Sequence, residues 1–461
     1  MKDIIILGGG PGGYEAAIRG AQLGAEVLLI EKDRLGGTCL NRGCIPTKAL
    51  YRNAEILKNV KEADHFGIEI PSYSLNVEKV QARKSEIVNS LVTGIEHLIK
   101  ANKIEYVQGT GKLIDKNTIE VKTGEGIITV QGKHIIIATG SETSLPPIEG
   151  ATLPGIYGSN EILEFNKVPE KLIIIGAGVV GVEFANIFNT FGSEVTLMLR
   201  GDLIIKTEDK EISKRLASYF KKSGIKIVNK IQYKHIKKEN DKYTVTVEGK
   251  KGEVSYTVDR ILMAAGRKPN IEHIGLDDIG ITYTKKGISV DNHYQTNINN
   301  VYAIGDVNGI LMLAHVASHQ GISVVERIMG KEPTINQNLV PNCIFTFPEV
   351  SSIGESEDSL KDKGIEYKTN KFNFMANGKA LALGEGDGFV KVIEVGNKLV
   401  GVHILGPHAS DLIHEAAIIL NQGLGVKEVA NTIHAHPTLA EAFVEAVLGL
   451  HNEAIHQAPK K

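Results

Sequence analysis

The chain has 461 residues, enough for about three domains and a large buried core. Its 52 Lys and Arg residues nearly balance 54 Asp and Glu residues, so bulk charge provides no attraction to nucleic acid or anionic membranes. Three cysteines exclude a disulfide-rich secreted scaffold. No basic-then-apolar leader opens the chain, and residues 172–182, the longest uncharged apolar stretch, are too few to span a bilayer. We therefore expect a cytoplasmic protein that binds neither nucleic acid nor membranes.

Two segments share one pattern of strand, glycine-rich turn, helix and strand. In the first, the parts are residues 4–7, 8–13, 14–24 and 27–30. In the second, they are residues 172–175, 176–181, 182–191 and 195–199. Each predicts the start of a dinucleotide-binding βαβ unit, in which bare backbone N–H groups and a helix N-terminus hold a pyrophosphate. One such glycine motif is weak evidence and two are strong, although both turns could instead serve only to pack a helix on a strand.

A cysteine pair follows the first unit, within residues 36–48. The Cys-x4-Cys spacing of Cys39 and Cys44 is not the usual zinc pattern, and no second cysteine pair exists to complete a site. They suit a redox dithiol whose thiolate is stabilised by the helix N-terminus and by Arg42 or Lys48. Two unpaired buried thiols or a metal site are the alternatives, and we expect no metal. Cys343 has no partner in the sequence and is expected to be a buried structural thiol.

The rest of the chain divides at its proline-rich and glycine-rich points. Residues 130–139 predict a strand that ends in Ala138-Thr139-Gly140-Ser141, and prolines at 146, 147, 154 and 169 mark a linker into the second unit. The alternating segment 243–247 predicts an antiparallel meander. A strand at residues 261–267 then closes the second unit. Beyond about Thr334 the mixed strands and helices carry no nucleotide motif and predict a third domain.

These motifs, together with Tyr302-Ala303-Ile304-Gly305-Asp306 and the segment from His434 to Glu441, resemble the pyridine nucleotide–disulfide oxidoreductases over essentially the whole chain. Within that family the dihydrolipoamide dehydrogenases are the most similar group. The resemblance implies an α/β fold with two Rossmann-like domains, for FAD and NAD(P), and a C-terminal α+β dimerisation domain. The implied division is an FAD domain at 1–145 and 272–335, an NAD(P) domain at 146–271 and an interface domain at 336–461.

The resemblance also assigns site residues. Catalytic roles fall to Cys39, Cys44, Lys48, Glu183, His436 and Glu441. The FAD site is expected to use Gly8, Gly10, Gly12, Gly13, Glu31, Lys32, Gly37, Thr38, Lys48, Gly111, Ala138, Thr139, Gly140, Ser141, Gly305, Asp306, Met312, Leu313, Ala314 and His315. The pyridine-nucleotide site is expected to use Gly176, Gly178, Val179, Val180, Gly181, Leu199, Arg200 and Lys206. Glu183 is expected to pair with Lys48 near the flavin, and Gly266 and Arg267 are further expected cofactor-binding residues. Glu31 also has a direct interpretation, as an acid that binds a ribose hydroxyl after the second strand.

The C-terminal motif predicts an acid–base pair. Pro437 fits the first turn of a helix, which places His436 just before that helix and Glu441 one turn into it. A carboxylate there can orient the imidazole and stabilise its charged form. A metal site at His434 and His436 lacks an evident third ligand. In the family the pair reaches the dithiol of the other subunit, so the resemblance implies a homodimer with a shared site.

The internal repeat allows a direct comparison of the two nucleotide sites. Glu31 lies 23 positions after Gly8, and the same step from Gly176 arrives at Leu199. The acid that would hold the 2′-hydroxyl of NAD is therefore missing, and Arg200 and Lys206 could bind a 2′-phosphate. Gly181 is more typical of NAD sites. We expect NADP, with NAD as the alternative and Arg200 as a solvated surface residue in that case.

The resemblance implies that His436 deprotonates a dithiol substrate, that the thiolate attacks Cys39, and that Cys44 is left as a thiolate beside the flavin, from which hydride passes to NAD(P)+. The expected substrate is protein-bound dihydrolipoamide, carried by the lipoyl protein of a 2-oxo acid dehydrogenase complex or a glycine cleavage system. Alternatives are an NADPH-dependent reductase of another small disulfide, similar to glutathione or mercuric reductases, and a non-redox flavin-binding or structural subunit. Thr47 and the lack of cysteines after residue 343 argue against the two named reductases, whereas Arg42 is unusual for the family.

Overall fold

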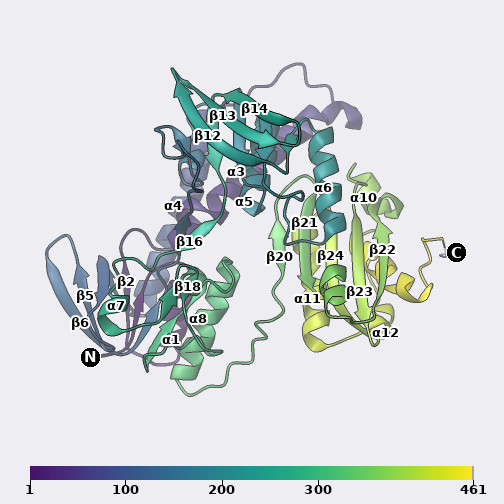
Figure 1. Cartoon of the computed structure of the whole chain (residues 1–461). Helices are drawn as coiled ribbons and strands as arrows, with labels where there is room; N and C mark the ends of the chain where they lie inside the picture. The colour runs from purple at the N-terminus through teal and green to yellow at the C-terminus, as the bar shows by residue number, and fades with distance from the viewer. Residues whose placement is uncertain (459–461) are drawn as a thin grey trace.

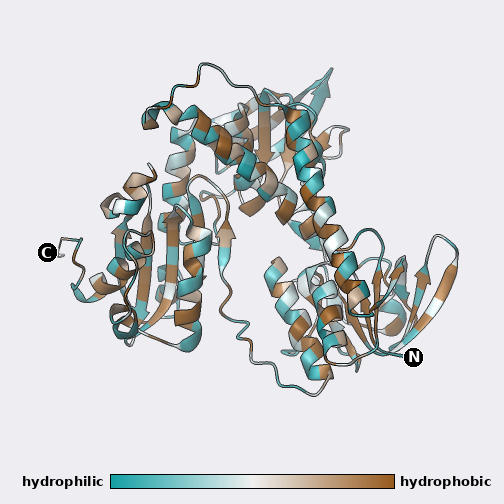
Figure 2. Ribbon diagram, turned by 180° about the vertical axis from the view of Figure 1, so that it is seen from behind, coloured by the Kyte–Doolittle hydropathy of each residue, from teal (hydrophilic) through white to brown (hydrophobic). Residues whose placement is uncertain are grey.

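Three main sheets with helices packed on them make up the chain, as Figure 1 shows for a computed structural model that describes residues 1–458. Residues 459–461, the end of the predicted interface domain, lie outside the described part. Hydrophobic residues concentrate in the strands, whereas the long helices carry both hydrophobic and hydrophilic residues (Figure 2). This pattern is expected where one face of each helix covers a sheet and the other meets water.

The first sheet has seven strands and contains segments from both ends of the first 330 residues. Its order is β3-β2-β1-β6-β5-β4, with β19 paired to β6. In the parallel neighbours β1 and β2, residues 4–7 of β1 and all of β2 are buried, which suits the apolar runs there. The bounds of its strands are β1 Lys2–Leu7, β2 Val27–Glu31, β3 Glu105–Gln108, β4 Thr110–Leu113, β5 Thr118–Lys122, β6 Ile127–Ile137 and β19 Val301–Ala303.

Helices and short pairs complete this part of the chain. The helix α1 packs closely beside α8, although about 300 residues separate them in sequence. The helices are α1 Pro11–Gln22, α2 Gly37–Arg42, α3 Cys44–Lys61, α4 Val77–Ala101, α7 Leu276–Ile279 and α8 Ala314–Ile328, with 3₁₀ turns at Ala63–Phe66 and Gly305–Asn308. The two-stranded pairs are β7 Ser141–Thr143 with β16 Arg267–Pro269, and β17 Tyr283–Thr284 with β18 Gly287–Ile288.

The second sheet is parallel throughout, in the order β11-β10-β9-β15-β8. Its elements are β8 Ile156–Tyr157, β9 Lys171–Ile175, α5 Val179–Phe191, β10 Glu194–Met198, α6 Lys210–Lys222, β11 Lys226–Val228 and β15 Arg260–Met263, with a 3₁₀ turn at Glu161–Glu164. The predicted meander is present as the antiparallel sheet β12 Gln232–Glu239, β13 Lys242–Gly249 and β14 Gly252–Val258. The proline-marked linker also contributes the edge strand β8.

The third sheet is antiparallel, in the order β20-β21-β24-β23-β22. Helices α11 and α13 pack against it, and α6 of the second unit contacts β24 (Figure 1). Its elements are β20 Asn342–Ile344, β21 Glu349–Gly354, α9 Glu357–Asp362, β22 Lys368–Asn373, α10 Gly378–Ala382, β23 Phe389–Val395, β24 Lys398–Gly406, α11 Ala409–Gln422, α12 Val426–Ala430 and α13 Glu441–Leu448, with 3₁₀ turns at Phe374–Ala376 and Gly449–His451.

One hydrophobic cluster joins the three parts. It contains Leu50 of α3, Ile174 of β9, Phe188 of α5 and Val350 of β21, all fully or almost fully buried. The cysteine-bearing helix α3 is therefore held between the second and third sheets. Within residues 1–458, none of the helices has the length and apolar character needed to cross a membrane.

Candidate active site

The first glycine turn joins β1 to α1 in a geometry that only glycine allows at two positions. Gly8 has φ of 115°, and a Cβ there would lie 2.2 Å from the carbonyl oxygen of Ala138. A Cβ on Gly13 would lie 1.8 Å from the Gly8 carbonyl oxygen. At Gly10, by contrast, a Cβ would meet only the Cα of Gly37, at 3.9 Å. Gly8 and Gly13 thus pack helix on strand, and Gly10 leaves the N-terminal end of α1 open to a ligand.

Glu31 ends β2 beside this turn. Its carboxylate accepts hydrogen bonds from the backbone N–H groups of Gly9, at 2.6 Å, and Asp33, at 2.8 Å. Glu31 is buried and also lines the cavity at the turn. Backbone donors therefore fix the orientation of the carboxylate, which keeps free lone pairs for a ribose hydroxyl.

A cavity of about 1640 Å³ connects the glycine turn, the cysteines, the start of α5 and the β20 segment. It is lined by most of the predicted residues: Gly8, Gly10, Gly12, Glu31, Lys32, Gly37, Thr38, Cys39, Cys44, Lys48, Gly111, Ala138, Thr139, Gly140, Ser141, Val179, Val180, Glu183, Arg267, Gly305, Asp306, Met312, Leu313, Ala314 and His315. Other predicted residues lie outside this lining: Gly13, Gly176, Gly178, Gly181, Leu199, Arg200, Lys206, Gly266, His436 and Glu441.

The two cysteines are free thiols on successive helices, with Gly43 between them. Cys39 lies in α2, and Cys44 is the first residue of α3 and reaches the cavity. The hydrogen bond with Cys44, together with burial, raises the pKa of Cys39 far above its ordinary range. The hydrogen bond with Cys39 and the charge of Lys48 lower the pKa of Cys44 to about 7, although burial acts in the opposite direction. The arrangement therefore stabilises a thiolate on Cys44 and a thiol on Cys39.

Lys48 and Glu183 form an ion pair across the cavity wall. The Lys48 Nζ lies 3.0 Å from both carboxylate oxygens of Glu183, which is almost fully buried. Glu183 also accepts a hydrogen bond from the Phe345 N–H at 3.1 Å, and the Lys48 Nζ lies 4.3 Å from the centre of the Phe345 ring. These contacts fix the ammonium group near Cys44, one turn along the same helix.

Ser141, Arg267 and Asp306 form a second cluster of polar side chains that lines the cavity. Arg267 donates to the hydroxyl of Ser141 at 2.7 Å and to its carbonyl at 2.6 Å. The Ser141 hydroxyl donates to Oδ2 of Asp306. The same carboxylate oxygen lies 3.8 Å from Arg267 Nε. Three predicted residues from distant parts of the sequence thus form one hydrogen-bonded group.

The second glycine turn repeats the geometry of the first. Gly176 has φ of 110°, and a Cβ there would lie 2.2 Å from the Ala264 carbonyl oxygen. A Cβ on Gly181 would lie 2.0 Å from the Gly176 carbonyl oxygen, whereas Gly178 faces open space. Strand pairing supports the comparison between the two units, because Leu7 pairs with Ile30 and Ile175 pairs with Met198.

The residues after β10 show where the two nucleotide sites differ. Leu199 is 6 % exposed and its side chain packs in the hydrophobic cluster, so no carboxylate stands at this position, and its place at the nucleotide site stays a prediction. Burial of this apolar side chain is favourable because it removes hydrophobic surface from water. Arg200 and Lys206 are exposed, and the Arg200 guanidinium lies 5.9 Å from the centre of the Tyr233 ring.

The C-terminal acid–base pair is present, but the prediction of its helix is wrong. His436 Nδ1 lies 2.9 Å from Glu441 Oε1, and the other carboxylate oxygen accepts from the Thr438 N–H at 2.8 Å. Pro437 follows a cis peptide bond and precedes the helix, and Glu441 is the first residue of α13. The intervening residues form a turn in which the Glu441 side chain binds the Thr438 N–H, so the helix begins four residues later than Pro437. The Thr438 hydrogen bond lowers the pKa of Glu441, with a further contribution from His436.

Within one chain, the structure leaves His436 away from the cysteines. Its side chain is 79 % exposed, and it lies outside the lining of the cavity. Ile433, close by in sequence, is 98 % exposed. No cluster of three or more His, Cys, Asp and Glu side chains in residues 1–458 is arranged to hold a metal ion, and this includes the region of His434.

Sequence reasoning missed Phe345, which supports both members of the Lys48–Glu183 pair. Its contacts with them span about 160 to 300 residues, and no local pattern signals such a contact. It also missed Gln320, which accepts from the Gly305 N–H at 2.7 Å and from Asn308 at 2.9 Å, and so fixes the backbone before Asp306.

Two glycine turns of the dinucleotide type and a polarised dithiol in the cavity of the first define a dinucleotide-dependent dithiol–disulfide oxidoreductase. Comparison with known proteins agrees. Residues 2–321 match the family model described as pyridine nucleotide-disulphide oxidoreductase, and residues 340–447 match the dimerisation domain of the same family. The chain belongs to the pyridine nucleotide-disulphide oxidoreductase family, a family of flavoproteins that also use a pyridine nucleotide, and the predicted fold class is confirmed.

Individual relatives refine the comparison. The chain is 43% identical to a dihydrolipoyl dehydrogenase of Bacillus subtilis, over 98% of this chain and 99% of that protein. It is 44% identical to the mitochondrial dihydrolipoyl dehydrogenase of Rattus norvegicus, over 97% and 90% of the two chains. Among solved structures, the HOCl-induced flavoprotein disulfide reductase RclA from Escherichia coli superposes with a TM-score of 0.86 at 27% identity, covering 96% of this chain and 99% of that one. The resemblance to dihydrolipoamide dehydrogenases is thus confirmed.

Proposed function

We propose that the protein oxidises dihydrolipoamide carried on another protein and passes the electrons through FAD to a pyridine nucleotide. The observation that carries this proposal is the unequal pair of thiols, with a thiolate favoured on Cys44 beside the Lys48–Glu183 pair. An enzyme that exchanges disulfides with a substrate needs two different sulfurs. One sulfur exchanges with the substrate, and the other, as a thiolate, transfers the electrons. The names of the full-length relatives support dihydrolipoyl groups as the substrate class.

The residues at the first glycine turn fit FAD. Gly10 leaves the N-terminal end of α1 accessible to a pyrophosphate, and Glu31 presents a fixed carboxylate to a ribose. The remaining lining residues that the sequence predicted would surround the rest of the cofactor. When bound, FAD supplies the two-electron relay between the thiols and the pyridine nucleotide.

The protein side chains carry out the disulfide exchange. With Cys39 and Cys44 in the disulfide form, His436 accepts a proton from one substrate thiol, and the thiolate attacks Cys39 Sγ. The bond between the two cysteine sulfurs breaks, and Cys44 leaves as a thiolate next to the ammonium group of Lys48. The second substrate thiol attacks the substrate sulfur of the mixed disulfide, which closes the disulfide of the product and breaks its bond to Cys39. The proton of the second thiol passes to Cys39, which is released as a thiol. The substrate is oxidised by two electrons, and the cysteine pair is reduced by two. Glu441 holds His436 in position and stabilises its protonated form.

We infer that the active site is shared between two copies of the chain. His436 is exposed in a region that matches the family's dimerisation domain, and it lies outside the cavity that holds the cysteines. In a homodimer, the partner subunit's His436 would reach Cys39. A lipoyl-bearing protein of a 2-oxo acid dehydrogenase complex or of a glycine cleavage system would deliver the substrate, and the cytoplasm is the compartment we propose.

For the electron acceptor we propose NADP+. Leu199 stands where an NAD-binding carboxylate would be, and the exposed side chains of Arg200 and Lys206 can form charge-assisted hydrogen bonds with a 2′-phosphate. The matched strand register of the two glycine units supports this alignment.

The deciding measurement is kcat/KM with dihydrolipoamide as donor, for NAD+ and NADP+ separately. A preference for NADP+ of about tenfold or more, which corresponds to about 1.4 kcal/mol, supports both the substrate and the acceptor. Rapid turnover with NAD+ instead refutes the acceptor and keeps the substrate. Turnover with glutathione disulfide but not with lipoamide refutes the substrate and supports the alternative reductase.

A further inference from the structure

The loop that carries Arg200 and Lys206 is held near its middle and at its C-terminal end. We call residues 200–209 the phosphate loop. Near its middle, the Ile205 N–H donates to the carbonyl of Ala177 in the second glycine turn at 2.7 Å. Ile205 has φ of 39°, a conformation that β-branched residues rarely adopt and that persists only where the surroundings impose it. The isoleucine side chains at 204 and 205 are buried, so the loop is anchored to its own unit.

The other end of the loop is tied to the third sheet. Glu208 accepts hydrogen bonds from Ser352 of β21, at 2.6 Å, and from Asn342 of β20, at 2.5 Å. Asp209 caps α6 through the Glu211 N–H at 2.8 Å, and its other carboxylate oxygen lies 2.9 Å from Lys391 Nζ on β23. The contacts with Ser352, Asn342 and Lys391 all cross from the nucleotide unit to the C-terminal unit.

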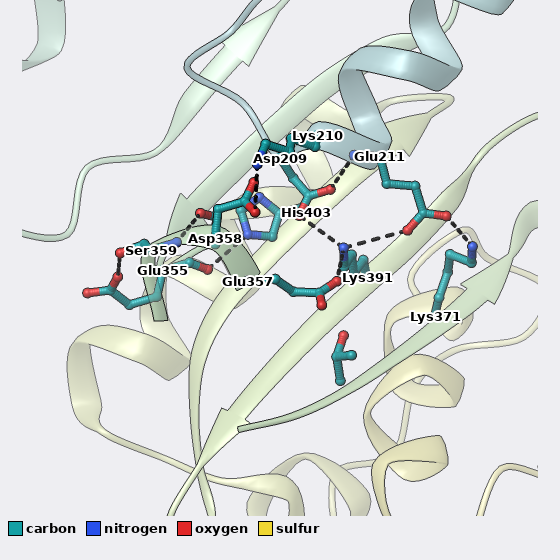
Figure 3. A network of polar contacts seen from close by, with 12 residues as sticks. Asp209, Lys210, Glu211, Glu355, Glu357, Asp358, Ser359, Lys371, Lys391 and His403 are labelled. Atoms are coloured by element: carbon teal, nitrogen blue, oxygen red, sulfur yellow. Dashed lines mark hydrogen bonds and ion pairs between the residues drawn. The ribbon is translucent and has the colours of Figure 1, made fainter. Parts of the chain in front are cut away.

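Lys391 is the centre of this junction. Figure 3 shows its ammonium group between Asp209 and Glu211 of the α6 start and Glu357 of α9. The Lys391 side chain is only 5 % exposed, so one buried cation serves three carboxylates. Lys371 lies directly opposite on β22, but it is more exposed and contacts Glu211 without reaching Asp209.

The neighbouring charges make Lys391 the cation of this cluster. Burial lowers the pKa of His403, which favours the neutral ring, and its Nε2 donates to the Glu355 carbonyl at 2.9 Å. Burial raises the pKa of Asp209, but the hydrogen bond and charge of Lys391 outweigh it, and the pKa is lowered. Burial likewise lowers the pKa of Lys391, and the carboxylates of Glu357 and Asp209 raise it above its ordinary value. A buried ion of this kind is costly to leave without its partner.

We propose that Lys391, acting through Asp209, is a positioning residue for the pyridine nucleotide: it holds the phosphate loop in the conformation in which Arg200 and Lys206 meet the adenosine ribose. This inference rests on the proposed location of the nucleotide site. The C-terminal unit then contributes to nucleotide affinity without touching the nucleotide. It does so because the last residues of the phosphate loop, Glu208 and Asp209, contact the third sheet.

Lys391→Met in the full-length, FAD-loaded enzyme tests the proposal. Steady-state kinetics with dihydrolipoamide are expected to show a KM for the preferred nucleotide that is higher by about threefold or more, the size typical of residues that act through a packed network. The kcat and the KM for dihydrolipoamide are expected to stay within about twofold of the wild type. Lys371→Met, on the neighbouring strand, is the matched control and is expected to leave all of these values unchanged.

Asp209→Asn keeps the proposal falsifiable if Lys391→Met loses FAD or fails to fold. Asparagine still caps a helix, so this change removes the charge and keeps the cap. It is expected to raise the nucleotide KM as Lys391→Met does, and the double variant is expected to show less than the product of the two effects. A nucleotide KM in Asp209→Asn equal to that of the wild type overturns the proposal. So does a variant that loses FAD and in which kcat and both KM values worsen together.

The outcome is separable from the proposed function. The wild-type preference for NAD+ or NADP+ decides the acceptor, whereas the ratio of variant to wild-type KM for the nucleotide actually used decides the role of Lys391. Oxidation of NADH or NADPH with ferricyanide as acceptor gives the same ratio even if dihydrolipoamide is not the substrate.

Discussion

Leu199 occupies in the second dinucleotide unit the position that Glu31 occupies in the first. The strand registers match, because Gly8 donates to the Ile30 carbonyl at 2.8 Å and Gly176 donates to the Met198 carbonyl at 2.9 Å. Glu31 turns its carboxylate to the glycine turn, whereas Leu199 is buried in the core. The same backbone therefore presents an acid at one nucleotide site and leaves Arg200 as the first polar side chain at the other.

This relationship predicts the effect of Arg200→Ala. The variant is expected to lose about tenfold or more in kcat/KM for NADP+, because a charge-assisted contact with the 2′-phosphate is removed. Its kcat/KM for NAD+ is expected to stay within about twofold, since NAD+ lacks that phosphate. Arg215→Ala, which removes an exposed arginine of α6, is the control. Equal losses with both nucleotides would contradict a role at the 2′-position.

The thiolate of Cys44 depends on the charge of Lys48. Lys48→Met is expected to raise the pKa of Cys44 from about 7 toward the 9.0 of an unperturbed thiol, because the nearby cation lowers it. Glu183→Gln is expected to lower that pKa, because the carboxylate of Glu183 raises it. The measurement is the pH dependence of alkylation of the reduced enzyme with iodoacetamide.

The control for this pair is Lys58→Met, a half-buried lysine farther along α3 that contacts Glu62. Its alkylation profile is expected to match the wild type. Shifts in the same direction for Lys48→Met and Glu183→Gln would show that general disruption, rather than charge, sets the reactivity of Cys44.

A site shared between subunits predicts complementation. His436→Gln is expected to lower kcat by about 10² to 10⁴, because the proton acceptor is lost, and Cys44→Ser is expected to abolish turnover. When the two variant chains are expressed together, the His436→Gln chain of a mixed dimer supplies an intact cysteine pair. The Cys44→Ser chain supplies the partner's His436, so one complete site forms. Activity well above either parent is therefore expected in purified mixed dimers. Mixed dimers no more active than the parents would place His436 and the cysteines in the same chain.

The two kinds of glycine predict opposite effects on stability. Gly13→Ala would place a methyl group against the Gly8 carbonyl and is expected to cost about 1–3 kcal/mol and weaken FAD retention. Gly94→Ala, at an exposed position of α4 with open space around it, is expected to stabilise the protein by up to about 1 kcal/mol. Thermal unfolding followed by flavin fluorescence measures both. A Gly13→Ala protein as stable as the wild type would refute the packing role.

Much of the nucleotide-binding architecture could be predicted from local patterns. The strands, turns and helices of both glycine units lie within a few residues of their predicted places, although α1 begins at Pro11 and α5 at Val179 rather than three residues later. The start of α13 could not be predicted, because it depends on the hydrogen bond from Thr438 to the Glu441 side chain. Pro437 alone is compatible with a helix start and with the turn that forms.

By itself, the sequence determined the two glycine turns, the neighbouring cysteines Cys39 and Cys44, and the pairing of His436 with Glu441, because each depends on residues close together in the chain. The tertiary structure decided which residues support them. Phe345 meets Lys48 and Glu183, and Lys391 meets Asp209, across separations of about 160 residues or more. Such contacts arise from the packing of one sheet against another, and packing of this kind leaves no short-range pattern in the sequence.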